Sequence, residues 1–191
     1  MKNNEFITSD HHWGHARVIE YSNRPFKHID EMNEFLIHAW NSKVSKGSIV
    51  YHLGDFAFMR PKDIVNLRKR LNGTIRLVVG NHDKITPEVR ELFEWVSDMY
   101  ESKTEDGTKV VMCHYPLLVW NKSHYGSWCL HGHSHHSLDS LNVKTKRFDV
   151  GVDTTVKYDN SSYAPYSFSE IKKIMDKRQY KSVDHHKAKR T

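Results

Sequence analysis

Cysteine is scarce in this sequence, and long apolar segments are missing from it. The two cysteines, Cys113 and Cys129, form no CxxC pair. A disulfide framework is therefore not expected, and a reducing compartment is favoured. No apolar run approaches the ~18 residues of a membrane-spanning helix. The first ten residues reach acidic and polar side chains too early for a signal peptide, so we expect a cytoplasmic protein without membrane association.

An excess of either charge is also missing from most of the chain. The 191 residues carry a formal net charge of +6, but residues 172–191 alone hold eight Lys or Arg against two Asp. Residues 1–171 are neutral, with 21 basic and 21 acidic side chains. The length suits one domain, which we place at residues 1–178, followed by a basic tail over 179–191 that we expect to be disordered. Such a tail usually aids solubility, and nucleic-acid binding is the alternative.

Apolar periodicity predicts strands that alternate with helices, the pattern of an α/β fold. Asp30 is placed to cap one helix, and Ser167 with Glu170 predicts a capping box on the last one. The expected strands cover residues 5–8, 48–53, 74–79, 96–101, 109–113, 128–131 and 148–152, and the expected helices cover 30–46, 61–71, 87–94 and 167–178.

Polar side chains suited to chemistry stand where the expected strands end. They are Asp10, Asp55, Asn81, His114 and His133. In α/β sheets the carboxyl ends of strands meet along one edge, where ligands bind. The positions of these residues therefore predict one shared site.

Histidine is abundant, with fifteen copies, and many of them lie in five short motifs. Any one motif has an ordinary explanation as a helix cap, a turn or a core histidine. Together they supply imidazole and carboxylate without thiolate, which suits Mn, Fe, Zn or Ni. Seven or eight such ligands are too many for one tetrahedral ion and suit two ions that share a bridge. The motifs are Asp10-His11-His12, Gly54-Asp55, Gly80-Asn81-His82-Asp83, His114-Tyr115-Pro116 and His131-Gly132-His133-Ser134-His135.

The order of these motifs resembles that of the calcineurin-like metallophosphoesterases, over residues 10–135. The flanking residues are most similar to those of small phosphoesterases of bacteria and their phages. The resemblance implies a sandwich of two β-sheets flanked by helices, and a binuclear metal centre bridged by Asp55. The implied ligands are Asp10, His12, Asp55 and His135 for one ion, and Asp55, Asn81, His114 and His133 for the other.

The same resemblance implies a hydrolytic mechanism. A metal-bridging hydroxide would attack the phosphorus of a phosphate ester, with His82 as the unligated general acid. Manganese is the first choice of cofactor, with iron, zinc or nickel as alternatives. The expected enzyme is a metal-dependent phosphoric ester hydrolase.

The sequence leaves the roles of some histidines and aromatic residues undecided. By strand alternation His131 points the same way as His133 and competes with it as a ligand. His11 and His15 are candidates to orient a ligand through a hydrogen bond. Trp120 and Tyr125 either line the substrate cleft or serve packing.

The range of expected substrates is narrowed by positions where this sequence differs from the family pattern. Where protein phosphatases place an Asp-Arg pair, this chain has Phe58-Met59. The first choice is a phosphodiesterase for nucleotides or cyclic nucleotides. A nuclease or nucleic-acid end-processing phosphatase is second, and a metal-binding interaction scaffold is the non-enzymatic alternative.

Overall fold

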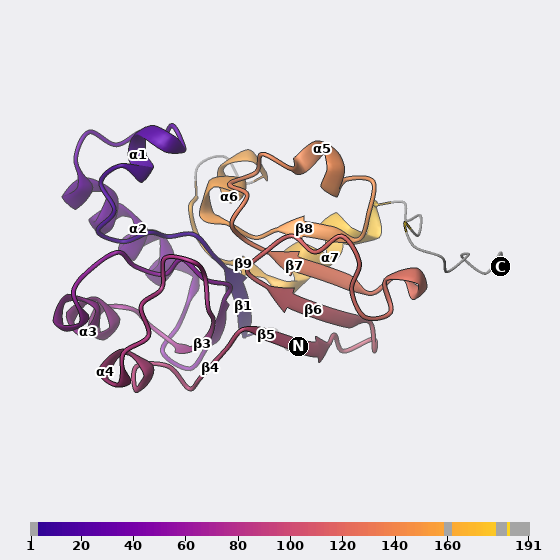
Figure 1. The fold of residues 1–191 in the computed structure, drawn as a ribbon, viewed down its shortest axis with the longest axis horizontal. Helices are drawn as coiled ribbons and strands as arrows, with labels where there is room; N and C mark the ends of the chain where they lie inside the picture. Colours follow the sequence, from indigo (N-terminus) through magenta and orange to yellow (C-terminus); the bar gives the residue numbers. More distant parts are fainter. Residues whose placement is uncertain (1–3, 159–161, 179–182, 184–191) are drawn as a thin grey trace.

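The computed structural model describes residues 4–158, 162–178 and 183, and contains two β-sheets flanked by helices (Figure 1). The first sheet has the strand order β4-β3-β2-β1-β9, in which β1 to β4 are parallel and β9 is antiparallel to β1. The second sheet has the order β5-β6-β7-β8, in which only β5 is antiparallel to its neighbour. This arrangement confirms the predicted two-sheet α/β fold.

Five of the predicted strands agree with the structure to within one residue at each end, whereas β9 was not predicted and the strand expected over 148–152 covers only Arg147–Asp149. The strands are β1 (Glu5–Thr8), β2 (Ile49–His52), β3 (Thr74–Val78), β4 (Trp95–Ser97), β5 (Met99–Lys103), β6 (Lys109–Cys113), β7 (Trp128–His131), β8 (Arg147–Asp149) and β9 (Tyr166–Ser167). The helices are α1 (Val18–Tyr21), α2 (Ile29–Lys43), α3 (Pro61–Arg70), α4 (Pro87–Arg90), α5 (Asp139–Asn142), α6 (Val152–Tyr158) and α7 (Phe168–Asp176), with a 3₁₀ turn at Ser123–Tyr125.

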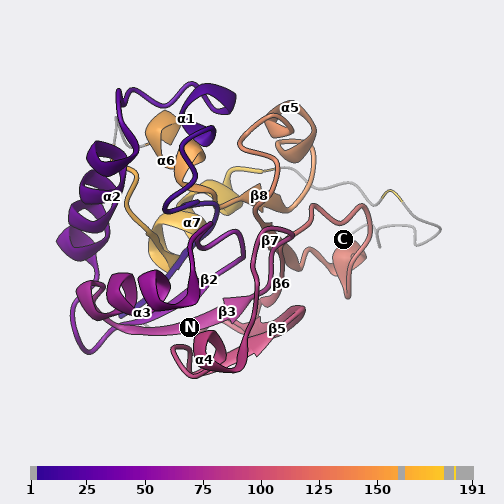
Figure 2. The same cartoon turned by 60° about the vertical axis from the view of Figure 1, so that its left-hand side comes forward.

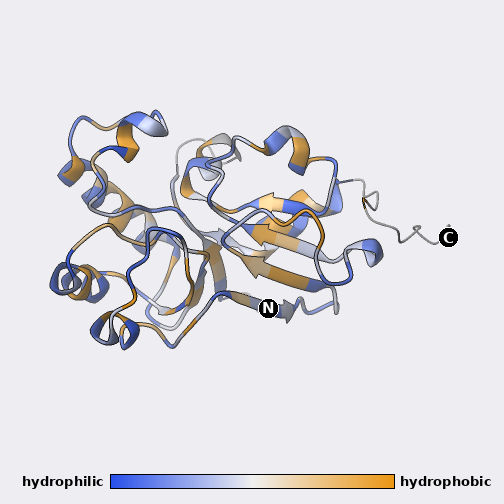
Figure 3. Cartoon of the chain, in the orientation of Figure 1, coloured by the Kyte–Doolittle hydropathy of each residue, from blue (hydrophilic) through white to orange (hydrophobic). Residues whose placement is uncertain are grey.

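The first sheet is buried on both faces, so its strands read as nearly continuous apolar segments. On β1, Phe6 packs toward the helical layer and Ile7 toward the second sheet, because side chains alternate along a strand. The turned view places α2 and α3 on the outer face of this sheet (Figure 2). Apolar residues concentrate in the strands of both sheets (Figure 3). The sheet-to-sheet core and the helix-to-sheet core together hold the strand ends in place.

Two local predictions were wrong. Helix α2 begins at Ile29 with His28 as its cap residue, and Asp30 lies in the first turn without capping. Glu31 at the third helical position instead accepts the backbone N–H of Lys27, the residue before the cap, at 2.9 Å.

The segment predicted as one strand over 96–101 is divided between the two sheets. Strand β4 pairs with β3, whereas β5 pairs with β6. The Ser97 hydroxyl donates to the carbonyl of Met99 at 2.8 Å, which bends the chain around Asp98. The two consecutive polar residues Ser97 and Asp98 interrupt the apolar alternation at this bend.

The C-terminal helix follows the prediction. The Ser167 hydroxyl accepts the N–H of Glu170, and the Glu170 carboxylate accepts the N–H of Ser167 at 2.7 Å, which completes the capping box. The basic tail predicted over residues 179–191 lies outside the described residues, apart from Val183. The division into a domain and a tail stays a prediction.

Candidate metal centre

The loops that follow the parallel strands continue to hydrogen bond with one another beyond the sheets. The N–H of Asp10 donates to the carbonyl of Gly54, and the N–H of His12 to that of Asp55, both at 3.0 Å. On the second sheet, the N–H of Gly132 donates to the carbonyl of His114 at 3.0 Å. The loops after β1 and β2 are thus fixed side by side, and so are the loops after β6 and β7.

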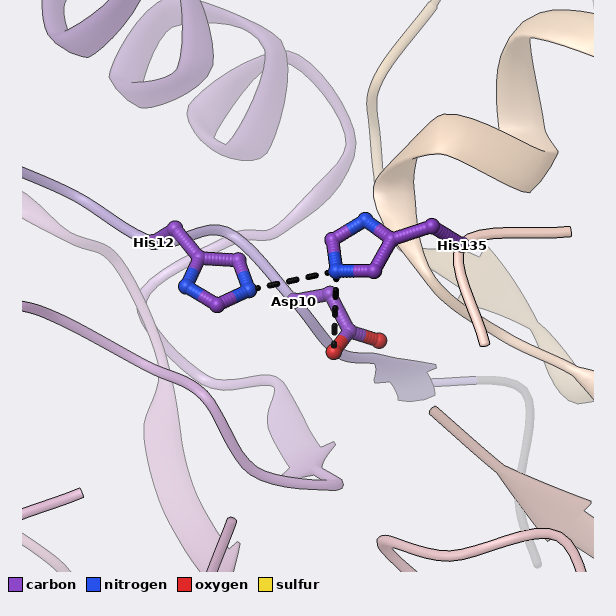
Figure 4. Close-up of side chains that lie close together, drawn as sticks. All are labelled: Asp10, His12 and His135. Atoms are coloured by element: carbon purple, nitrogen blue, oxygen red, sulfur yellow. Dashed lines mark hydrogen bonds and ion pairs between the residues drawn. The ribbon is translucent and has the colours of Figure 1, made fainter. Parts of the chain in front are cut away.

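Two groups of side chains at this edge could each hold a metal ion. The ligand atoms within each group lie within 4.8 Å of one another. Figure 4 shows the first group, in which the Nε2 atoms of His12 and His135 are 3.3 Å apart and Asp10 lies beneath them. The first group is Asp10, His12 and His135, and the second is Asp55, His114 and His133.

The Asp55 carboxylate lies between the two groups. Its Oδ2 atom is 3.5 Å from Nε2 of His12 and 3.6 Å from Nε2 of His114. The side-chain oxygen of Asn81 is 3.0 Å from the same His114 nitrogen. All seven residues predicted as ligands therefore converge, and members of both groups line one cavity of about 500 Å³.

The backbone at this site is unusual. Asp10, His12, Asp55, His133 and His135 all have positive φ angles between 43° and 68°. This left-handed region costs a non-glycine residue roughly 1–2 kcal/mol. Such conformations cluster at functional sites, where the surrounding structure must hold them.

Asp83 holds the second and third strand loops together. Its carboxylate accepts three backbone N–H groups at 2.8–2.9 Å, from Asp55, Phe56 and Gly80. The N–H of His82 donates in turn to Oδ1 of Asp55 at 2.9 Å. A Cβ atom on Gly80 would approach the Asp55 nitrogen to 2.3 Å, so only glycine allows this close passage.

Asp153 was not predicted, yet it orients a ligand. Its carboxylate forms a two-point ion pair with Arg24 at 2.8 and 2.9 Å and lies 2.6 Å from Nδ1 of His135. Arg24 also donates to the carbonyl of Asp10 at 2.7 Å. A carboxylate on the outer nitrogen of a histidine fixes its tautomer and leaves the other nitrogen for a metal. Asp153 lies in the first turn of α6 and belongs to none of the five motifs, so the sequence offered no signal for it.

The pKa shifts of the candidate ligands differ in direction. Burial opposes the charged form of His135, but Asp153 and Asp10 raise its pKa above the ordinary value. Burial, partly offset by His135, raises the pKa of Asp10 to about 7. Burial and the neighbouring His135 lower the pKa of His12 to about 2, so this imidazole is neutral and can act as a ligand. Burial opposes ionisation of Asp153, but Arg24 and His135 together hold its pKa well below the ordinary value. A cation in the site would favour the ionised form of Asp10.

The structure shows the surroundings of the residues whose roles the sequence left undecided. Both ring nitrogens of His131 have protein partners, the Gly132 carbonyl at 2.8 Å and the Asn142 amide at 3.1 Å, and His131 belongs to neither group. His11 stacks on Trp13 in the core. Trp120 is buried against β6 and β7, so it serves packing.

His15, the other histidine beside the first motif, lies at the rim. Its ring is 5.5 Å from that of His12 and 5.7 Å from that of His82, centroid to centroid. Its side chain therefore borders the predicted general acid, and it lines the same cavity.

Comparison with known proteins decides the family. The model of the calcineurin-like phosphoesterase superfamily domain matches residues 6–166. The chain belongs to this superfamily. The family and the two His/Asp groups together support a metal-dependent phosphoesterase. No helix within the described part of the chain has the length and apolar character to cross a membrane.

The phosphoesterase chain also resembles individual proteins. Protein MJ1445 of Methanocaldococcus jannaschii is 34% identical over 178 residues, covering 90% of this chain and 91% of that protein. The Gene 66 protein of Mycobacterium phage L5 is 27% identical, covering 78% and 86% of the two chains. The crystal structure of AQ665 from Aquifex aeolicus superposes with a TM-score of 0.69 at 21% identity, covering 89% and 98%, which shows a shared fold.

Replacing the carboxylate between the two groups should reduce the metal content. We expect purified protein to carry close to two transition-metal equivalents per chain. Asp55→Asn should lower that number, because a neutral amide is a poor bridge between two cations. Metal analysis by mass spectrometry measures both values, with Asp98→Asn as the control, since Asp98 is exposed and far from the ligands in sequence. One equivalent in both wild type and Asp55→Asn would contradict a shared ligand.

Stabilisation by a divalent cation should grow as pH rises. The folded-state pKa of Asp10 is about 7 against an ordinary 3.8, so the metal-free fold loses stability as pH rises through this interval. A bound cation pairs with the carboxylate and removes that loss. We expect the increase in Tm caused by Mn²⁺ to be larger near pH 7.5 than near pH 5.5, measured by thermal melts. A larger increase at the lower pH would be the opposite of this prediction.

Proposed function

We propose that this chain is a two-metal phosphodiesterase that acts on nucleotides, with manganese as the preferred ion. The observation that carries the proposal is the pair of ligand groups around Asp55, with His82 lining the same cavity. Two divalent cations, when bound, stabilise the charge of a phosphoryl group in transfer and acidify water. The intact ligand set argues against a purely structural scaffold.

His82 is held in a position suited to proton donation. Its backbone N–H is tied to the Asp55 carboxylate, and its ring lies 5.3 Å from that of His12, centroid to centroid. The side chain is half-buried at the cavity wall and belongs to neither metal group. From there His82 donates a proton to the departing oxygen of the ester, a contribution of roughly 10²–10⁴-fold.

The cavity favours a diester over a monoester. Among the described residues that line it there is no lysine or arginine. A dianionic monoester would have no cationic side chain for its additional charge. A diester carries a single negative charge at phosphorus, and its alkoxide leaving group requires the proton from His82.

Substitution of His82 should lower turnover more than binding. For His82→Gln we expect kcat on a nucleotide diester to fall roughly 10²–10⁴-fold, with KM nearly unchanged. The loss should be smaller for p-nitrophenol, a leaving group that needs less protonation. Steady-state kinetics with both substrates measures the difference, and the exposed His38→Gln is the matched control. An equal loss on both substrates would argue for a structural role.

The substrate preference tests the proposed function directly. We expect kcat/KM for bis-p-nitrophenyl phosphate to exceed that for p-nitrophenyl phosphate in Mn²⁺, because the cavity provides no additional positive side chain. The two esters share a leaving group, so the ratio reports on the remaining substituent. A strong preference for the monoester would replace this proposal with a phosphomonoesterase.

A further inference from the structure

A second cavity opens beside the metal centre, and His82 lines both cavities. Its volume is about 400 Å³, within the range of roughly 300–1,000 Å³ that small-molecule sites occupy. Phe58, Met59, Arg60, Ile64 and Lys84 line it together with His82. No predicted metal ligand lines this cavity, so its chemistry differs from that of its neighbour.

The wall between the two cavities is fixed to the metal-binding loop. The N–H of Phe58 donates to the carbonyl of Trp13 at 2.8 Å, and the N–H of Trp13 to that of Phe56 at 3.2 Å. The Phe58 ring lies 5.0 Å from the ring of His15 and 5.9 Å from that of His82, centroid to centroid. The position of Phe58 relative to the metal centre is therefore determined by backbone hydrogen bonds.

The lining combines an apolar floor, an aromatic face and positive charge. Ile64 and Met59 belong to the helix-side core, whereas Phe58 is 48% exposed. Arg60 is paired with Asp63 at 2.8 Å, but Lys84 makes no ion pair within the described part of the chain. A ligand with a planar base and a phosphate group matches this lining. Bases stack on aromatic side chains, and phosphates pair with lysine.

We propose that this cavity binds the leaving group of the phosphodiester as a nucleotide, with its base on Phe58 and its own phosphate near Lys84. The proposal rests on the proposed function, since His82 between the cavities would protonate the departing oxygen. In the balanced reaction, the oxygen of a water molecule bonds to phosphorus and one proton of that water passes to solvent. The P–O bond to the leaving nucleotide breaks, and its oxygen takes a proton from His82, which His82 regains from solvent. A separate leaving nucleotide favours a linear diester over a cyclic nucleotide, whose leaving oxygen stays on the same nucleoside.

Dinucleotides that differ by one phosphate test the subsite. We would measure kcat/KM for TpT, pTpT and TpTp with full-length protein in Mn²⁺. One of the two phosphorylated forms should exceed TpT by about 5-fold, the effect of one charge pair at ~4 Å in water. Lys84→Ala should bring that ratio close to one, and Lys84→Glu should invert it. Lys69→Ala, an exposed lysine in the last turn of α3, should leave the ratio unchanged.

Phe58 gives an independent measurement. Phe58→Ala should raise KM for TpT about tenfold by removing base stacking, and Phe58→Trp should restore it. The subsite would be overturned if the wild type preferred neither phosphorylated form, or if the Lys84 variants left the ratio unchanged. In that case hydrolysis of bis-p-nitrophenyl phosphate would still support the proposed function. Failure to hydrolyse any diester would overturn the proposed function and the subsite with it.

Discussion

The candidate centre depends on two hydrogen bonds that join the sheets at their carboxyl edges. The Asp10 carboxylate, which follows β1, accepts the N–H of His133, which follows β7, with both oxygens at 3.0 Å. The His114 ring, which follows β6, donates from Nδ1 to the carbonyl of Leu53, which follows β2, at 2.8 Å. Each sheet therefore supplies the partner that positions a ligand of the other. These bonds add to the apolar core that packs the two sheets together.

The ligands are held by groups that never face the cavity directly. Arg24 and Asp153 neutralise one another in the interior, and removal of one partner from such a buried pair generally leaves a costly uncompensated charge. Asp83 accepts hydrogen bonds from three backbone N–H groups in loops, where no neighbouring strand offers a partner. These contacts stabilise five residues in left-handed conformations. The geometry of the centre therefore depends on Arg24, Asp153 and Asp83 as much as on the candidate ligands themselves.

Sequence reasoning predicted that the candidate ligands lie close together because strand ends are visible in apolar patterns. Asp10, Asp55 and His114 follow shortly after such segments, and parallel strands bring their ends together. His131 could not be resolved this way, since alternation gives its direction but not its hydrogen-bond partners. Asp153 and the cavity at Phe58 depend on contacts between distant segments, which no local pattern encodes. The bend at Asp98 did have a local signal, because the consecutive polar residues Ser97 and Asp98 interrupt the apolar alternation of the predicted strand.

The antiparallel pairing of β9 with β1 has a consequence for synthesis on the ribosome. Strand β1 is made first, but its outer edge is covered only after Tyr166 and Ser167 have left the exit tunnel. Arg24 likewise has its partner 129 residues later in the chain. Through most of translation, the N-terminal half therefore has an unpaired edge on β1, and Arg24 lacks the carboxylate of Asp153. Such intermediates are prone to aggregation. Two late contacts end this state, because Asp153 pairs with Arg24 and orients His135, and β9 completes the first sheet.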